Sequence, residues 1–121
     1  MKKVLVVDDF ASVRIYHSNL IRHMGYVAIE AADGDAASKI LSSTDIDLVL
    51  LDLYMPNKDG RSVIETLGQG SRRKPPVIVI TSESERFGSN QLSTLPVQSV
   101  ISKPVRPAAL KEAIMLAIGN N

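Results

Sequence analysis

The sequence lacks cysteine and tryptophan, and aromatic residues make up only 4% of it. Without cysteine, the chain cannot form disulfides, thiolate metal sites or a cysteine nucleophile. An excess of one charge is also missing, because 14 lysines and arginines nearly balance 13 acidic residues and leave a net charge of +1. A near-neutral chain has no strong field for polyanions, so we expect no direct binding of nucleic acid.

Long hydrophobic runs are missing as well. The longest, Val4–Val7 and Leu48–Leu51, have the length of strands and end at or next to carboxylates. A membrane-spanning helix needs roughly 20 apolar residues, so we expect no membrane segment. Two lysines before Val4 resemble the start of a signal peptide, but Asp8 and Asp9 end the apolar run too early for one. We therefore expect a cytoplasmic protein.

The length fits one domain. A chain of 121 residues that is 45% hydrophobic can bury one compact core and is too short for two independent ones. We expect a single domain over residues 1–121, with no room for a separate output domain. Any output must then come from a partner or from a fused domain outside this sequence.

Segments with strand and helix patterns alternate along the chain. Apolar runs predict strands at 3–7, 27–31, 47–51, 76–80 and 97–102. Helical spacing predicts helices at 13–24, 36–41, 63–67 and 107–118, and more weakly at 82–95. Asp33-Gly34 is typical of a turn, and we expect Met115 to fill the core. Five such repeats predict an α/β fold: a doubly wound, five-stranded parallel sheet of order 2-1-3-4-5, flavodoxin-like (βα)5.

Polar residues follow four of the predicted strands. In an open parallel sheet, the carboxyl ends of the strands meet at one edge, which is where such folds place their sites. The residues that this rule brings together are Asp8, Asp9, Asp52, Thr81, Ser82, Lys103 and Pro104.

Three carboxylates at one edge repel each other. Two unit charges about 5 Å apart cost on the order of 3 kcal/mol at an effective dielectric near 20. One strand-ending aspartate is commonly a turn former, but three of them beside Lys103 indicate a site. Either Lys103 or a hard divalent cation would relieve the repulsion, and oxygen-only ligands favour Mg²⁺ or Mn²⁺. The Thr81 hydroxyl and Lys103 are suited to holding phosphoryl oxygens.

Taken in order, these residues resemble the receiver domains of two-component response regulators. The resemblance covers essentially the whole chain. The segments that carry it are Val4–Asp9, Gly25-Tyr26, Ala32–Gly34, Asp47–Asp52, Met55-Pro56, Asp59-Gly60, Thr81-Ser82 and Lys103-Pro104.

The resemblance implies a role for each acid. Asp52 is similar to the phosphoacceptor, which takes a phosphoryl group from a phosphohistidine of a sensor histidine kinase or a phosphotransfer protein. Asp8 and Asp9, with Asp52 and the backbone carbonyl of Tyr54, are similar to the set that holds Mg²⁺ (or Mn²⁺). We expect a switch that is phosphorylated and slowly dephosphorylated, not a turnover enzyme.

Other residues are implied at the same site. Thr81 and Lys103 are similar to the hydroxyl and the ammonium group that contact the phosphoryl group. Ser82, Glu83 and Pro104 are expected to flank it.

The resemblance also implies an output face, formed by the fourth helix, fifth strand and fifth helix, whose binding to a protein target changes on phosphorylation. The chain departs from the family at Val100, where receivers usually carry an aromatic ring that moves inward. Three alternatives remain: small backbone shifts, a substitute ring at Phe87, or a receiver that is constitutive or a phosphate sink. A phosphorylation-dependent homodimer is also left open.

Two other classes of protein fit parts of the pattern. Phosphohydrolases with an aspartyl nucleophile carry two aspartates after the first strand, but separated by one residue and not adjacent like Asp8 and Asp9. A flavodoxin-like module that binds flavin mononucleotide would need a phosphate-binding loop there, and two acids would repel the phosphate.

Overall fold

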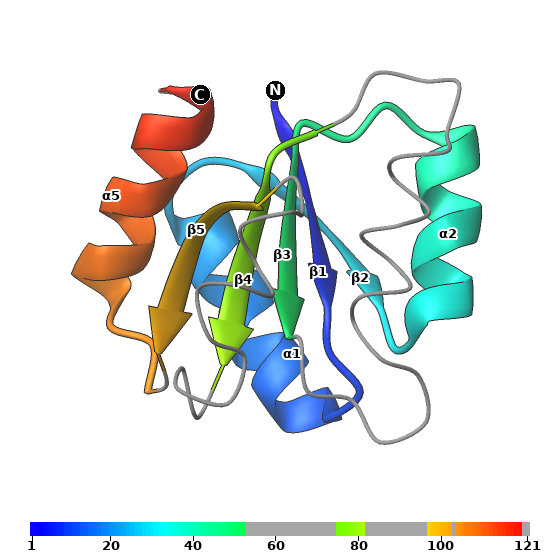
Figure 1. Ribbon diagram of the computed structural model, residues 1–121, viewed down its shortest axis with the longest axis horizontal. Coiled ribbons are helices and arrows are strands. Elements are labelled where there is room, and N and C mark those ends of the chain that lie inside the picture. The colour runs from blue at the N-terminus through cyan, green and yellow to red at the C-terminus, as the bar shows by residue number, and fades with distance from the viewer. Residues whose placement is uncertain (53–74, 82–96, 103, 120–121) are drawn as a thin grey trace.

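The computed structural model describes residues 1–52, 75–81, 97–102 and 104–119. In this part of the chain, five parallel strands form one sheet of order β2-β1-β3-β4-β5, which confirms the predicted class and order (Figure 1). The strands are β1 (Lys3–Val7), β2 (Val27–Ala31), β3 (Leu48–Asp52), β4 (Val77–Thr81) and β5 (Val97–Ser102). The helices are α1 (Ala11–His23), α2 (Gly34–Ser43) and α5 (Pro107–Ile118). The helices expected at 63–67 and 82–95, and Phe87, lie outside the described residues.

Helices cover both faces of the sheet. Side chains alternate along each strand, so Leu5 and Val7 pack in the core beneath α2, whereas Val4 and Val6 pack in the core with residues of α1 and α5. Figure 1 shows α2 on one side of the sheet and α1 and α5 on the other. Every residue of β3 is buried, as expected for a central parallel strand covered on both faces.

Strands β3 and β4 each begin and end one residue later than predicted. Asp47 precedes β3, where its backbone N–H donates to the Lys3 carbonyl (2.8 Å) and its carboxylate accepts from the Lys3 N–H (2.7 Å). Pro76, which has no N–H to donate, precedes β4, and its carbonyl accepts from Val49. As a result, Asp52 and Thr81 are the last residues of strands and not the first residues of loops.

The helix ends follow local rules, with one correction. Gly25 follows α1 with a φ of 93°, which a residue without a Cβ adopts readily, as predicted for a glycine at a helix end. The Asp33-Gly34 pair predicted as a turn instead begins α2: Asp33 is the N-cap, and its Oδ1 accepts from the Ala36 N–H at 2.8 Å.

The prediction that Met115 fills the core is wrong, since it is 39% exposed.

The end of α5 is held at the edge of the sheet where the strands begin. Lys2 Nζ donates to the Ile118 carbonyl, and the Tyr26 hydroxyl donates to the Gly119 carbonyl at 2.9 Å. Burial raises the pKa of the Tyr26 hydroxyl above its usual value of 10.0. These two contacts join α5 to the beginnings of β1 and β2.

Candidate functional site

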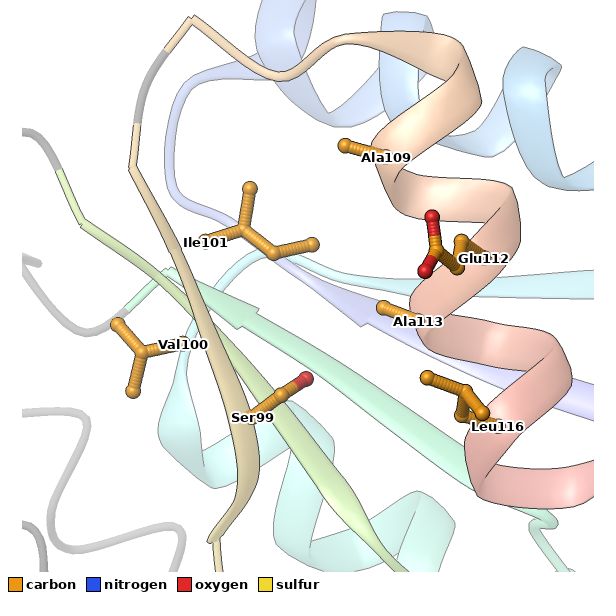
Figure 2. Close-up of a pocket in the computed structure, with 7 residues that line it drawn as sticks. All are labelled: Ser99, Val100, Ile101, Ala109, Glu112, Ala113 and Leu116. Carbon is orange, nitrogen blue, oxygen red and sulfur yellow. The ribbon is translucent and has the colours of Figure 1, made fainter.

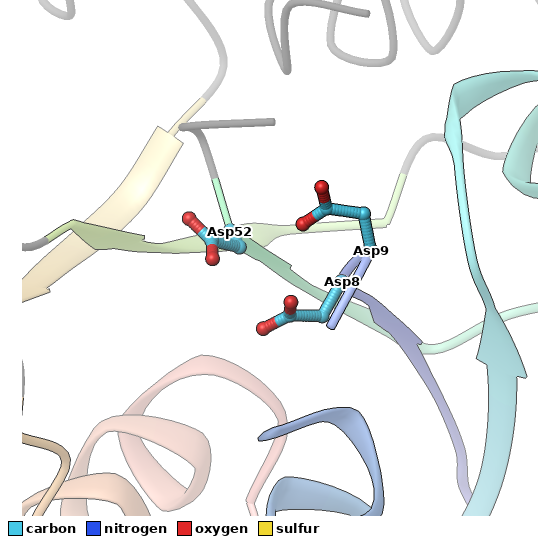
Figure 3. Close-up of side chains that lie close together, drawn as sticks. All are labelled: Asp8, Asp9 and Asp52. Atoms are coloured by element: carbon cyan, nitrogen blue, oxygen red, sulfur yellow. The ribbon is translucent and has the colours of Figure 1, made fainter. Parts of the chain in front are cut away.

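Three aspartates meet at the carboxyl end of the sheet. β1 and β3 are parallel neighbours, and Val7 lies opposite Leu51. Continuing this register by one residue places Asp8 beside Asp52. One carboxylate oxygen from each of Asp8, Asp9 and Asp52 lies within 4.8 Å of the others. Figure 3 shows the three carboxylates gathered on the same side of the strand ends.

The backbone around Asp8 is held from several directions. Asp8 is only 1% exposed. Its N–H donates to the Ala31 carbonyl at 3.1 Å, which extends the pairing of β1 with β2. Its Oδ1 accepts from the Phe10 N–H at 3.0 Å, a local bond that turns the chain from β1 toward α1. Asp8 is thus fixed in place before any ligand binds.

Charge and burial make this cluster suited to a hard cation. The Asp52 carboxylate lies close to those of Asp8 and Asp9. Because Asp52 is only 3% exposed, little water screens the repulsion between them. Asp9 Oδ1 is buried and has no hydrogen-bond partner within the part of the chain that the structure describes. A buried carboxylate oxygen without a donor costs free energy unless a cation or water satisfies it. Three converging carboxylates are a donor set that fits Mg²⁺ or Mn²⁺.

Arg14 and Glu30 belong to this site and were not predicted. Arg14 Nη1 donates to the Asp8 carbonyl at 2.8 Å, and Arg14 Nε donates to Glu30 Oε1 at 3.0 Å. Glu30 also lies 3.6 Å from Arg22 Nη2. The signal available in the sequence was Glu30 itself, a charged residue within the otherwise apolar strand β2.

The remaining predicted residues are placed only in part. Thr81 ends β4 and pairs with Ser102 of β5, which puts its backbone at the same edge as the acids; its side chain is not described. Pro104 is exposed and lines an open cavity of about 500 Å³ with Val13, Tyr16, His17 and Val105. The other predicted members of the site, Tyr54, Ser82, Glu83 and Lys103, lie outside the described residues.

Val100 lies on the surface of β5. It is 40% exposed and pairs with Val79 in the sheet. Figure 2 shows Val100 at one side of a groove of about 290 Å³ between β5 and α5, with Glu112 and Leu116 on the helix side. The position at which the resemblance leads us to expect a ring therefore carries an exposed aliphatic residue.

None of the helices in the described residues combines the length and the apolar character needed to cross a membrane.

Comparison with known proteins identifies the family. Residues 4–115 match the model of the response regulator receiver domain. The chemotaxis protein CheY of Pseudomonas aeruginosa is 32% identical over 114 residues, which cover 93% of this chain and 92% of that protein. The chemotaxis protein CheY1 of Helicobacter pylori is 31% identical, and the match covers 98% of each chain.

A solved structure agrees with these sequence relatives on the fold. The chemotaxis protein CheY4 of Vibrio cholerae is 25% identical, covers 97% of this chain and 98% of its own, and superimposes with a TM-score of 0.88. This match extends the agreement from sequence to fold. The family match favours a receiver domain over the phosphohydrolase and the flavin module. The chain belongs to the family of response regulator receiver domains, which are phosphorylation switches of two-component signalling and not turnover enzymes.

Proposed function

We propose that residues 1–121 form one receiver domain that accepts a phosphoryl group on Asp52. The observation that carries this proposal is the convergence of the Asp8, Asp9 and Asp52 carboxylates within 4.8 Å at the carboxyl edge of the sheet. Asp52 ends the central strand β3, so the rigid core fixes its position. The donor is a phosphohistidine of a sensor kinase or phosphotransfer protein: an Asp52 oxygen bonds to phosphorus, the P–N bond breaks, and the released imidazole nitrogen takes up a proton.

Asp8, Asp9 and Asp52 would hold Mg²⁺ (or Mn²⁺) together with the backbone carbonyl of Tyr54. The receiver domain of a sensor histidine kinase from Pseudomonas aeruginosa, whose fold matches with a TM-score of 0.88 at 22% identity, has a magnesium ion coordinated in its active-site cleft. A cation here supplies charge neutralisation for the phosphoryl oxygens. The buried Asp9 Oδ1, which has no donor within the described part of the chain, supports this assignment.

The hydroxyl of Thr81 and the ammonium group of Lys103 would contact the phosphoryl oxygens. Thr81 supports this role through its place at the end of β4, beside the strand that carries Asp52. Ser82, Glu83 and Pro104 flank the site in this proposal, and the side chains of Tyr54 and Glu83 govern the access of water to it.

The output is a change in protein binding at the face formed by β5 and α5, which the resemblance extends to the helix expected at 82–95. The exposed residues Val100, Arg106 and Lys111 support a docking role for this face. Because Val100 has no ring, we expect the coupling to rely on small backbone shifts of β5. A constitutive or phosphate-sink receiver is the alternative, and it would bind its target equally with and without the phosphoryl group.

Intact-mass spectrometry tests the proposal. The protein is incubated with a small acyl-phosphate donor and Mg²⁺. We expect a gain of one phosphoryl group, which is lost without Mg²⁺ and in Asp52→Asn. Absence of the mass gain in the folded wild type contradicts the proposal.

Asp45→Asn is the matched control. Asp45 is an exposed aspartate outside the cluster, so this variant should be modified like the wild type. Loss of the adduct in both variants would mean that Asp52 is not specifically required.

A further inference from the structure

The sheet has two edge strands, β2 and β5, and β2 is protected by nearby side chains. An edge strand leaves main-chain N–H and C=O groups without a neighbouring strand, and another chain can pair with them. On β2, the Val27 N–H bonds inward to the Lys2 carbonyl, so the main chain of Ala28 faces outward. Arg22 Nη2 donates to that Ala28 carbonyl at 3.4 Å, and Glu30 places a charge in the same strand. Side-chain donors and charges of this kind hinder pairing with another chain.

Strand β5 lacks this protection in the part of the chain that the structure describes. Its sequence, VQSVIS, contains neither a charged residue nor a proline. Its pairing with β4 shifts register near the start, between Val77 and Ile78, and is regular over 99–102. Among the described residues, no side chain forms a hydrogen bond with its main chain. Residues 99–102 therefore offer a regular edge with which another chain can pair.

A groove of about 290 Å³ lies between β5 and α5 (Figure 2). On the helix side, Ala109 and Ala113 have small side chains, which leave room next to the strand. Ile101 and Leu116 make other parts of the wall apolar. A strand added to β5 would lie about 4.8 Å from it and direct every second side chain to the face that α5 covers. The groove therefore suits side chains of an extended segment.

Two polar groups of the groove have no partner among the described residues. Ser99 Oγ is buried without a hydrogen-bond partner, and the exposed Glu112 forms no ion pair there. Figure 2 shows the Ser99 hydroxyl directed toward α5 and the Glu112 carboxylate on the helix side of the same groove. A basic side chain complements this pair, because its apolar stem can lie along the alanines while its charged end bonds to the carboxylate.

We propose that β5 accepts an extended segment of a partner protein as a sixth strand, with a basic residue of that segment opposite Glu112. Main-chain hydrogen bonds to residues 99–102 supply the affinity, and the groove supplies the specificity. A helical partner would leave the main-chain groups of the β5 edge without hydrogen bonds, which is why we infer a strand. The inference rests on the proposed function in taking β5 and α5 as the output face, and it names what that face recognises.

A peptide titration of the full chain, followed by heteronuclear NMR without any phosphodonor, tests the inference. The probe is a capped peptide in which valine and threonine alternate around one central arginine. We expect saturable shifts of the amides of β5 and of the groove side of α5. The same peptide with N-methyl groups on alternate residues keeps its side chains but loses the donors of one edge. It should not bind if the segment adds as a strand.

Charge reversal tests the role of Glu112. Glu112→Lys should weaken binding of the arginine peptide about tenfold or more, and it should bind a peptide with glutamate in place of arginine more tightly than the wild type does. Asp45→Lys is the matched control. It makes the same change of charge at an exposed aspartate outside the groove and should leave both affinities unchanged.

Three outcomes overturn the inference. The first is the absence of shifts in β5 at millimolar peptide. The second is equal binding of the N-methylated peptide, which would mean that side chains alone are recognised. The third is a shift of the β5 amides when the free protein is concentrated, which would assign the edge to a second copy. None of these outcomes bears on Asp52, which the mass gain tests separately.

Discussion

Arg14 binds the main chain of Asp8: its Nη1 donates a hydrogen bond of 2.8 Å to the Asp8 carbonyl oxygen. The same guanidinium group is held on its other side by Glu30, with Nε 3.0 Å from Oε1. Glu30 thus anchors Arg14, and Arg14 anchors the chain at the point where β1 delivers its two aspartates. The positive charge of Arg14, next to the acid cluster, is thus paired with Glu30 and hydrogen-bonded to the Asp8 carbonyl.

Removing Arg14 should loosen the site. We expect Arg14→Ala to lower the free energy of unfolding by about 1–2 kcal/mol, because two hydrogen bonds with a charged group are lost. It should weaken Mg²⁺ binding about tenfold, the usual scale for a group that orients metal ligands. Urea unfolding measures the loss of stability. Mg²⁺ titration followed by heteronuclear NMR measures the loss of Mg²⁺ affinity. Arg22→Ala is the control, since Arg22 is half exposed and 3.6 Å from Glu30; equal loss in both variants would contradict the positioning role.

The acid cluster should destabilise the fold when no divalent cation is present. Asp52→Asn removes one of three crowded charges and keeps the shape of the side chain. We expect the free energy of unfolding in a chelator to rise by roughly 1–3 kcal/mol. Mg²⁺ should raise the Tm of the wild type more than that of the variant, because binding to the folded state adds stability. Asp45→Asn removes an aspartate charge outside the cluster, so it should neither raise the free energy of unfolding nor reduce the effect of Mg²⁺ on the Tm. A destabilised Asp52→Asn would contradict the repulsion.

The N-cap of α2 should contribute stability without affecting the chemistry. Asp33→Ala removes the acceptor of the Ala36 N–H and should cost about 1 kcal/mol. Asp33→Asn keeps an acceptor oxygen at the same place and should cost much less. Urea unfolding measures the difference, and modification of Asp52 should be unchanged in both variants. Equal losses of stability in the two variants would mean that the negative charge of Asp33 stabilises α2, and not its hydrogen bond to the Ala36 N–H.

Tyr26 should make stability depend on pH in the alkaline range. Because burial raises its pKa above 10.0, the folded state keeps a proton that the unfolded state releases. The stabilisation is complete below pH 10 and is lost as pH rises through the folded pKa. Tyr26→Phe should remove this part of the pH dependence and cost about 1 kcal/mol at neutral pH through the lost bond to Gly119. Tyr16→Phe, which removes a hydroxyl from an exposed ring, is the comparison. The assignment to Tyr26 fails if both variants flatten the alkaline profile equally.

The parts of the fold and site that could be predicted depend on local patterns combined with one rule of topology. The apolar run before Asp8 is enough to identify β1, and alternation with helices implies a parallel sheet. Once the strands are parallel, Asp8, Asp9 and Asp52 must meet at one edge, although more than forty residues separate them. Neither step requires knowledge of any tertiary contact, which is why both predictions are confirmed.

The parts that could not be predicted depend on contacts between distant elements or on a choice between local motifs. Arg14 meets Glu30 across 16 positions, and nothing in the helical pattern of α1 selects that partner. Asp33-Gly34 suits a turn and a helix start equally well, and only the Ala36 hydrogen bond decides. Met115 has a core-type side chain, but Leu110 and Ile114 already occupy the buried face, so it is left outside.

The corner where Lys2 and Tyr26 hold the end of α5 lies at the opposite end of the sheet from the acids. At the carboxyl end of the sheet, the crowded carboxylates lower the stability of the fold. At the other end, the hydrogen bonds that Lys2 and Tyr26 donate to main-chain carbonyls of α5 and Gly119 raise it. Substitutions can therefore accumulate, or be engineered, at the Lys2–Tyr26 corner to raise or lower robustness while the acid cluster keeps its geometry. The stability contributed where the strands begin can therefore be changed separately from the site at their carboxyl ends.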